Sequence, residues 1–404
     1  MNHTRYPFGL PHSRESSRPP NRPPKHEEEK HPPRPHNARP QRPPPLAFVS
    51  LGLTQFEDVQ HNRYEVVRDV LGGPGLYSML GARILAGYAR RREIGYLGVV
   101  GVDGLPQREL DRLLAWDTQF LVVGERRQET TRAVVKYEEY PSQPFRLATW
   151  HFATPPLHPH TLPAFHSRPQ FSSASSIHLF GAPALITSQI TTLLELRGPA
   201  APRPLLVWEP DPTTLTAHTL PSYLNACKLV DVFSPSDVEL TKLFSLLPQG
   251  TQVPRFRARE IEHYAKLLLE EGIGPTGHGT LVVRAGAHGC LVAGRRQVPE
   301  MVWLPAYYRG ENAGAVVDVT VAGSVFLGAL AYALSVAGLG MVDVVQAARL
   351  ATVAASFKVE RVGLPRVVRS AAGEEFWNGV SMAQRWPRYL RGVEGVVYRP
   401  ASDR

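Results

Sequence analysis

The chain has only two cysteines in 404 residues, Cys227 and Cys290. They stand far apart and form no CxxC pair, which excludes a disulfide scaffold and argues against a zinc site. This cysteine usage is typical of a reducing compartment. The first residues also lack the apolar stretch of a signal peptide. We therefore expect a cytoplasmic protein with no metal site of its own.

Acidic residues are outnumbered, and the net charge of +9 is concentrated at one end of the chain. Residues 1–45 hold nine Lys and Arg against four Glu, so this segment contributes +5 of the total. The remainder is only mildly basic. That distribution argues against a nucleic-acid-binding domain.

The same segment contains 13 prolines and almost no aliphatic residues. This composition cannot bury enough apolar surface to offset chain entropy, so residues 1–45 are predicted to be a disordered, partly polyproline II tail. The tail is either a solvated extension or a ligand for a protein partner that binds proline-rich or basic segments. We expect it to make no packing contacts with the folded body.

A long uncharged run stands at residues 319–342. These 24 residues carry no charge and are long enough to cross a bilayer. The run nevertheless contains polar residues such as Thr320 and Ser335. We predict a buried central helix here and no membrane span.

Short apolar segments alternate with helical patterns beyond residue 46. Segments with the composition of buried strands include 46–51, 94–102, 205–208 and 281–284. Helical patterns between them include 76–90, 237–247, 261–271 and 344–358. This alternation predicts an α/β fold, with a doubly wound, mainly parallel sheet covered by helices on both faces.

The uncharged run begins at a motif that lacks one carboxylate. Residues 318–326 read Asp-Val-Thr-Val-Ala-Gly-Ser-Val-Phe. They resemble the second signature of the ribokinase-like (pfkB) carbohydrate kinases, D-T-x-G-A-G-D-x-F. In that family the Gly-Ala-Gly run opens a helix whose backbone N–H groups hold phosphate, because a helix N-terminus favours anions. The resemblance assigns this anion hole to Val321, Ala322 and Gly323.

Ser324 occupies the position of the family's catalytic Asp. A serine hydroxyl does not ionise near neutral pH and cannot be a comparable general base. Val321 replaces the first glycine and adds bulk where the backbone should approach phosphate. The resemblance leaves Asp318 as an organiser of the loop. These departures predict impaired catalysis, which Ser324→Asp alone is expected to raise.

Two further landmarks lie on the side where the family binds its sugar. Gly72-Gly73 before a helix resembles the first signature, with Tyr77 at its Asn position. Glu57 stands where a family Asp binds sugar hydroxyls. The resemblance therefore implies a substrate site for a sugar or nucleoside at Glu57, Gly72, Gly73 and Tyr77. The glycines could equally close a strand-to-helix turn.

The nucleotide side of the family is matched by two other segments. Residues 236–239 resemble N-x-x-E, with Ser236 in place of Asn, and residues 282–289 resemble V-T-x-G-x-x-G. The resemblance implies ATP and Mg as cofactors, held near Ser236, Glu239, Arg284, Gly286 and Gly289. Glu239 has the alternative of a solvated helix residue, and Arg284 that of pairing with an acidic neighbour.

Other segments are similar to a fungal, maintenance-of-killer-like branch of this family. They include residues 69–73, 208–212, 232–235, 353–357 and 362–365. The resemblance implies a ribokinase-like αβα sandwich at 46–380, with a small β lid from about 55–70 and 118–150. Residues 381–404 would form a C-terminal extension.

Three functions are compatible with these residues. The leading hypothesis is a carbohydrate-kinase-like protein that is catalytically impaired and acts by ligand binding or assembly. The first alternative is an active ATP-dependent kinase of a sugar or nucleoside. The second is an interaction scaffold that recruits protein partners through its Pro/Arg tail. The sequence does not predict the oligomeric state.

Overall fold

The computed structural model describes residues 45–60, 65–124, 129–139, 144–151, 157, 168–245, 256–295, 300–336 and 343–400. The chain divides into a unit of residues 1–42 and a unit of residues 43–404. All described residues belong to the second unit. Apart from Pro45, the predicted tail lies outside the described residues.

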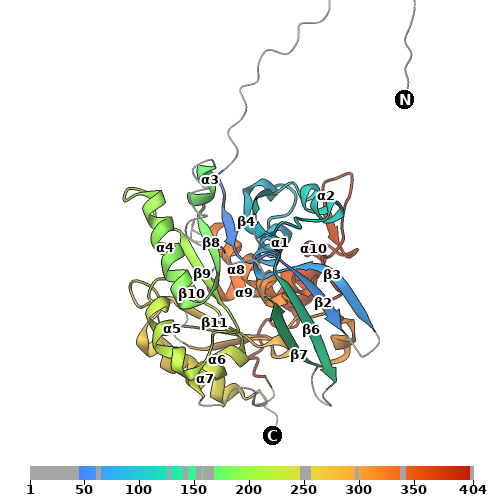
Figure 1. Ribbon diagram of the computed structural model, residues 1–404. Helices are drawn as coiled ribbons and strands as arrows, with labels where there is room; N and C mark the ends of the chain where they lie inside the picture. The colour runs from blue at the N-terminus through green and yellow to red at the C-terminus, as the bar shows by residue number, and fades with distance from the viewer. Residues whose placement is uncertain are drawn as a thin grey trace, which may run out of the picture. The chain divides into compact units, whose positions relative to one another are not determined.

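A nine-stranded sheet forms the centre of the second unit (Figure 1). Its order is β13-β12-β11-β10-β9-β8-β1-β4-β5, and β12 alone runs antiparallel to its neighbours. The predicted doubly wound, mainly parallel sheet is therefore confirmed. The strands are β1 (Phe48–Leu51), β4 (Ile94–Val100), β5 (Gln119–Gly124), β8 (Ser176–Gly181), β9 (Leu205–Pro210), β10 (Val232–Phe233), β11 (Thr280–Arg284), β12 (Cys290–Gly294) and β13 (Val302–Leu304).

Helices cover both faces of this sheet, because its central strands are apolar on both sides. On β9, Val207 packs in one core cluster, while Leu206 and Trp208 pack in the other. The first cluster includes α1 (Pro74–Ala86), α8 (Ala322–Val336) and α9 (Val344–Ser356). The second includes α4 (Pro183–Arg197), α5 (Leu220–Cys227), α6 (Asp237–Phe244) and α7 (Ala258–Glu271). The predicted αβα sandwich is confirmed.

The uncharged run forms the buried helix α8 within the described residues, and ten of its residues are buried. Its backbone touches that of α1. A Cβ added to Gly328 would lie 1.7 Å from the carbonyl oxygen of Ser78, and one on Gly81 would lie 1.8 Å from that of Val325. Only glycine fits such a contact. In the part of the chain that the structure describes, no helix has the length and apolar character to cross a bilayer.

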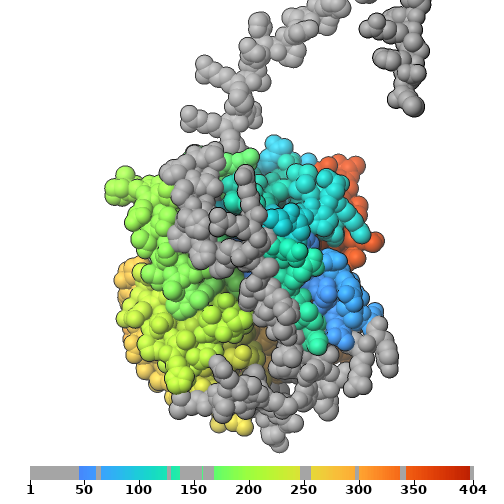
Figure 2. All heavy atoms as spheres, viewed as in Figure 1, coloured from blue at the N-terminus to red at the C-terminus, as the bar shows by residue number. Residues whose placement is uncertain are grey.

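A separate four-stranded sheet has the order β3-β2-β6-β7. Its strands are β2 (Gln55–Gln60), β3 (Val66–Gly72), β6 (Arg132–Glu139) and β7 (Pro144–His151). All four fall within the two segments predicted for the lid. The second segment also contains β5, which pairs with β4 along its whole length and belongs to the large sheet. In Figure 2 the β2, β3 and β6 atoms (blue to teal) lie on the side of the visible face opposite α4 to α7 (green to yellow).

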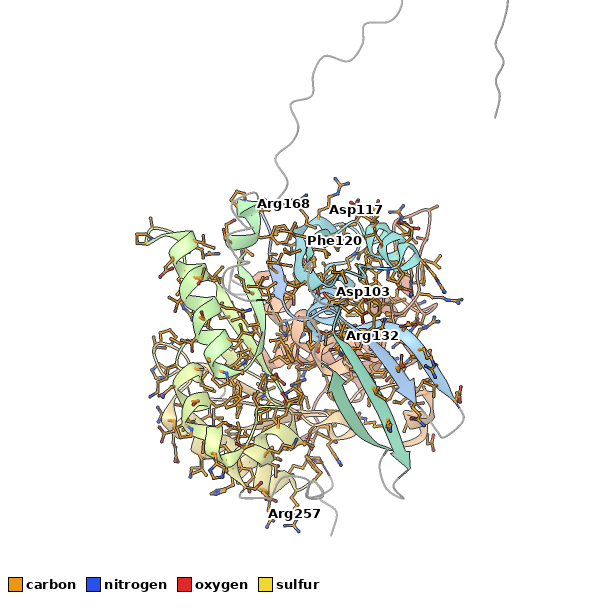
Figure 3. All side chains as sticks on the ribbon, viewed as in Figure 1. Asp103, Asp117, Phe120, Arg132, Arg168 and Arg257 are labelled. Carbon is orange, nitrogen blue, oxygen red and sulfur yellow. The ribbon has the colours of Figure 1, made fainter. Side chains whose placement is uncertain are left out.

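Ion pairs join the small sheet to its surroundings. Arg132 on β6 reaches Asp69 on β3, with 2.6 Å between Nη1 and Oδ1. The Nη2 atom of the same side chain lies 4.0 Å from Oδ2 of Asp103, in the loop after β4, and Figure 3 shows these two residues close together. Asp103 in turn accepts from the backbone N–H of Thr130. The loops that lead into the small sheet are therefore held to the end of β4.

The last elements pack onto the body of the sandwich. These are the hairpin β14 (Val367–Arg369) and β15 (Glu375–Trp377), and the helix α10 (Met382–Arg391). Arg83 of α1 forms a buried ion pair with Glu375 of β15, with 2.7 Å between Nη1 and Oε2. Arg385 of α10 donates to Ser356 at the end of α9. The remaining helical segments are α2 (Gln107–Ala115), α3 (Pro169–Ser172), η1 (Arg91–Glu93), η3 (Ala217–Thr219), η4 (Gly286–His288) and η5 (Gly310–Ala315).

Candidate functional site

The candidate site lies where α8 begins, against strands β8 to β11. In doubly wound sheets, ligands bind outside the carboxyl ends of the parallel strands, near the point where strand order reverses. Here the chain fills β4 and β5 on one side of β1 and then β8 to β11 on the other. Glu209 lies near the end of β9, and Arg284 ends β11. Both reach the first turn of α8.

A buried carboxylate, that of Glu209, is the hub of this site. Its Oε1 accepts from Ser324 Oγ at 3.0 Å and from Arg284 Nη1 at 2.9 Å. Its Oε2 lies 3.1 Å from Nε2 of His178, whose Nδ1 lies 2.9 Å from Ser50 Oγ. A polar chain therefore runs from β1 through β8 and β9 to α8.

The carboxylate of Glu209 is held in its ionised form. Burial alone would raise its pKa, since the residue is only 5% exposed. The Arg284 guanidinium and the hydrogen bonds from His178 and Ser324 outweigh burial and keep the pKa of Glu209 below its usual value. An ionised carboxylate can only accept, so Nε2 of His178 carries a hydrogen and donates it. The site thus contains a fixed negative charge.

The Arg284 side chain lies directly against the anion hole predicted from the motif. A Cβ added to Gly323 would be 2.3 Å from Arg284 Nη1. The other terminal nitrogen donates to the carbonyl oxygen of Ser234 at 3.0 Å and to Glu239 Oε2 at 3.2 Å. The guanidinium is therefore held by two carboxylates. In this structure Arg284 pairs with acidic neighbours, which was the alternative to a role in nucleotide binding.

Ser236 and Glu239 cap the start of α6. The backbone N–H of Ser236 donates to Glu239 Oε2 at 2.7 Å, and the N–H of Glu239 donates to Ser236 Oγ at 3.2 Å. This reciprocal pair is a capping box. Burial raises the pKa of Glu239 and raises that of the adjacent Asp237 to about 6. Glu239 is thus an enclosed partner of Arg284 and not a solvated helix residue.

Asp318 is tied to the loop before α8 through contacts that include Thr320 and Lys358. It accepts from the N–H of Thr320 at 2.8 Å and pairs with Lys358 Nζ at 2.7 Å. Both side chains of this ion pair are at most 2% exposed. The loop therefore reaches the first turn of α8 from a charge-paired, buried anchor.

Val321, at the position of the motif's first glycine, has a backbone conformation that favours glycine. Its φ is +50°, in the left-handed region that β-branched residues avoid. The side chain is buried at 8% exposure, in the same cluster as α1 and α8. Packing of the side chain therefore offsets backbone strain of about 1–2 kcal/mol.

This strain predicts that at position 321 glycine is more stabilising than alanine, the reverse of their usual order in a helix. Val321→Ala loses burial and keeps the strain, while Val321→Gly loses burial and relieves the strain. We expect the glycine variant to be more stable than the alanine variant by about 1 kcal/mol. Urea unfolding of both variants measures the difference. Val325 within α8 is the matched control, because alanine should there exceed glycine by about 1 kcal/mol. If alanine were more stable than glycine at both positions, the proposed strain at Val321 would be contradicted.

The predicted sugar-side residues come together at the junction of β2, β3 and α1. A Cβ on Gly72 would lie 2.7 Å from Glu57 Oε1, so the glycine is needed for this close approach. Gly73 has φ +104° and faces the carbonyl oxygen of Leu53, so it also closes the turn into α1. Glu57 is 2% exposed and accepts from Gln55 at 2.6 Å.

Tyr77 fills part of this junction with its ring. It is 1% exposed and donates from its hydroxyl to the carbonyl oxygen of Leu71 at 3.1 Å. Burial raises the pKa of Tyr77, and the carboxylates of Glu57 and Asp318 raise it further. The phenol therefore lies between the sugar-side carboxylate and the loop of Asp318.

Gly286 and Gly289 shape the turn between β11 and β12. Their φ values are +52° and +85°, and a Cβ on Gly289 would lie 1.9 Å from the carbonyl oxygen of Leu304. The intervening His288 stacks on Phe256 at 3.9 Å between ring centroids. These contacts account for the two glycines by backbone geometry. Their part in nucleotide binding stays a prediction.

Comparison with known proteins identifies the family. The sequence profile of the pfkB family carbohydrate kinases matches residues 90–368. The chain therefore belongs to this family, as the motifs predicted.

Two curated relatives and one solved structure illustrate how far the similarity extends. An uncharacterized protein of Schizosaccharomyces pombe is 27% identical over 85% of this chain and 92% of its own length. Protein MAK32 of Saccharomyces cerevisiae is 22% identical over 87% of this chain and 93% of its own length. These relatives confirm the predicted fungal branch. The ribokinase of Giardia lamblia superposes with a TM-score of 0.62 at 15% identity, over 86% of this chain and 99% of that one.

Sequence reasoning missed the residues that hold the site together. Glu209 stood out only as part of Trp-Glu-Pro-Asp-Pro, and neither His178 nor Lys358 was singled out. One signal was present, since Glu209 is a charged residue inside an otherwise apolar strand. A buried charge needs a partner, and its partners come from β8, β11 and α8.

Proposed function

We propose that this protein is a carbohydrate-kinase-like protein with impaired phosphoryl transfer, which acts by binding a ligand or by assembly. One observation carries the proposal: the first turn of α8 is occupied by side chains of the protein itself. The Arg284 guanidinium is pressed against Gly323, and the Ser324 hydroxyl donates to Glu209. These are the positions where the family's motif would hold phosphate and place its base.

ATP with Mg is the donor that the family implies, but the residues present do not fit its phosphates. One guanidinium faces the two carboxylates of Glu209 and Glu239. A polyphosphate would bring further negative charge next to the carboxylate of Glu209, which is already paired with Arg284. It would also have to displace Arg284 from Gly323. We therefore derive no transfer step at this site.

The sugar side supports ligand binding better than the phosphate side. Glu57 keeps a buried carboxylate with one hydrogen bond from Gln55. The small sheet, which we propose as a lid over this side, supplies Glu57 from β2 and Gly72 from β3. A carboxylate beside backbone groups suits the hydroxyls of a sugar or nucleoside.

The proposal predicts binding without turnover. Calorimetry of the full chain with a panel of sugars and nucleosides should find a ligand, while ADP release with ATP·Mg stays at background. The reason is that Glu57 keeps a carboxylate on the proposed acceptor side, while the Arg284 side chain fills the first turn of α8. Robust ADP release that depends on one of these ligands would overturn the proposal.

An active kinase is the second candidate, and one contact favours it. Glu209 is ionised and 3.0 Å from Ser324 Oγ, so a carboxylate stands one hydrogen bond away from the base position. Glu209→Gln would then lower any turnover of the native protein.

A further inference from the structure

We infer that Glu209 is an internal anion that occupies the phosphate side of the site and makes it select uncharged ligands over phosphorylated ones. The inference rests on the proposed function, because it explains why the phosphate side is closed. It assigns to Glu209 a role in specificity that the family motifs do not assign.

The donors around Glu209 are those that a bound phosphate would use. A hydroxyl from Ser324, a guanidinium from Arg284 and an imidazole N–H from His178 all point to its two oxygens. Hydroxyl and guanidinium groups at a helix N-terminus are common ligands of phosphate oxygens. The carboxylate already accepts a hydrogen bond from each of the three, so among these groups an entering anion would find only the buried Nε–H of Arg284 without an acceptor.

The charges around the cluster oppose a second anion. Arg284 is the cation that β11 supplies, and it pairs with Glu209 of β9 and Glu239 of α6. Asp237, also on α6, lies close enough for Arg284 to lower its pKa, although burial raises that pKa to about 6. One guanidinium thus serves several carboxyl groups. A phosphate would gain little attraction unless Glu209 lost its charge.

The anchoring of Glu209 prevents a simple exchange with a ligand. Its Oε2 is tied to His178, which Ser50 supports from β1. Residues 50 and 178 are direct partners in the register of β1 and β8. Moving the carboxylate away would leave a buried imidazole N–H without an acceptor, which is costly. The native site therefore retains its own anion and admits neutral hydroxylated ligands.

The test removes the charge of Glu209 and keeps the side-chain size. Glu209→Gln in the full chain leaves a carbonyl oxygen for Ser324 and frees Arg284 to attract an external anion. We expect calorimetry to show inorganic phosphate and ATP·Mg binding at least about tenfold more tightly than to the native protein. Glu93→Gln is the matched control. It removes a carboxylate that pairs with Arg90 just before β4 begins, and it should leave the affinities for phosphate and ATP·Mg unchanged.

A second variant identifies the residue that binds the anion. Adding Arg284→Met to Glu209→Gln should abolish the gain in phosphate affinity, because the guanidinium provides the attraction. A gain that survives this change would contradict the inference, as would a single variant with native phosphate affinity. If Glu209→Gln does not fold, the native protein decides the matter. Inorganic phosphate binding below about 10 mM would then overturn the inference.

The outcomes separate the inference from the proposed function. Ligand-dependent ADP release by the native protein would refute the impaired kinase but would not measure phosphate affinity. Unchanged phosphate affinity in Glu209→Gln, together with absent turnover, would refute the internal anion and leave the impaired kinase standing. Loss of native turnover in Glu209→Gln would instead favour the second candidate function.

Discussion

Exchanging the charges of positions 209 and 324 is expected to raise phosphoryl transfer by about 10²–10⁴-fold over the native protein. The variant combines Glu209→Gln with Ser324→Asp. It places a carboxylate at the motif's base position and removes the one that lies 3.0 Å from the Ser324 hydroxyl. One carboxylate is removed and one is added, so the net charge of the cluster does not change, while Arg284 loses the Glu209 partner that holds it beside Gly323.

Ser324→Asp alone is expected to fail, which revises the expectation from the sequence. Two carboxylates would then face each other in a buried site, and one of them would be forced to take up a proton or move. The single variant should therefore lose stability and gain little activity. The structure supplies this reason through Glu209, which the motif does not contain.

The measurement is release of ADP from ATP·Mg in the presence of sugars and nucleosides, with release in their absence subtracted. The matched control combines Glu209→Gln with Ser324→Asn, which has the same shape but no charge at position 324. Equal rates for the exchange and this control would contradict the assigned role of the carboxylate. An inactive exchange variant that binds ATP would show that the sugar side at Glu57 and Tyr77 is not competent.

Lys358→Met is expected to lower the free energy of unfolding by about 3–5 kcal/mol. The change removes the cation 2.7 Å from Asp318 Oδ2 and leaves a carboxylate that is 2% exposed without its partner. The same ammonium also donates to the carbonyl oxygen of Arg361.

Urea unfolding provides the measurement, and two controls give it meaning. Lys358→Met combined with Asp318→Asn removes both charges of this pair. The double variant should therefore lose less free energy of unfolding than the single variant. Arg90→Met breaks an ion pair whose arginine is 48% exposed and should cost less than about 1 kcal/mol. A cost for Lys358→Met no larger than that for Arg90→Met would contradict the burial of this pair.

Most of the fold could be predicted from the sequence because its signals are local. Helix α8 and the central strands of the large sheet are apolar on both sides, and such continuous apolar segments can be recognised in the sequence. The assignment of residues 118–124 to the lid was wrong for a physical reason. Their composition suits a strand in either sheet, and only the pairing of β5 with β4 decides between them.

The candidate site could be predicted only in part. The motif gave the positions of Ser324 and Gly323, because their spacing is fixed along the chain. It could not give the partners of Ser324, since Glu209 lies 115 positions away and His178 on yet another strand. Nor could it show that Arg284 packs on Gly323, because that contact depends on how β11 meets α8. A charged residue in an apolar strand indicates that a partner exists, but a single sequence does not identify that partner.

The glycine contacts between α1 and α8 have a mechanical consequence. At Gly81 and Gly328 the two backbones meet with no side chain between them, so sliding or rotation would drive atoms into each other. Tyr77 belongs to α1, and Ser324 belongs to α8. The two helices therefore behave as one rigid block that carries both halves of the site. Any adjustment to a ligand must come from elements outside that block, such as the small sheet, whose strand β3 ends just before α1 begins.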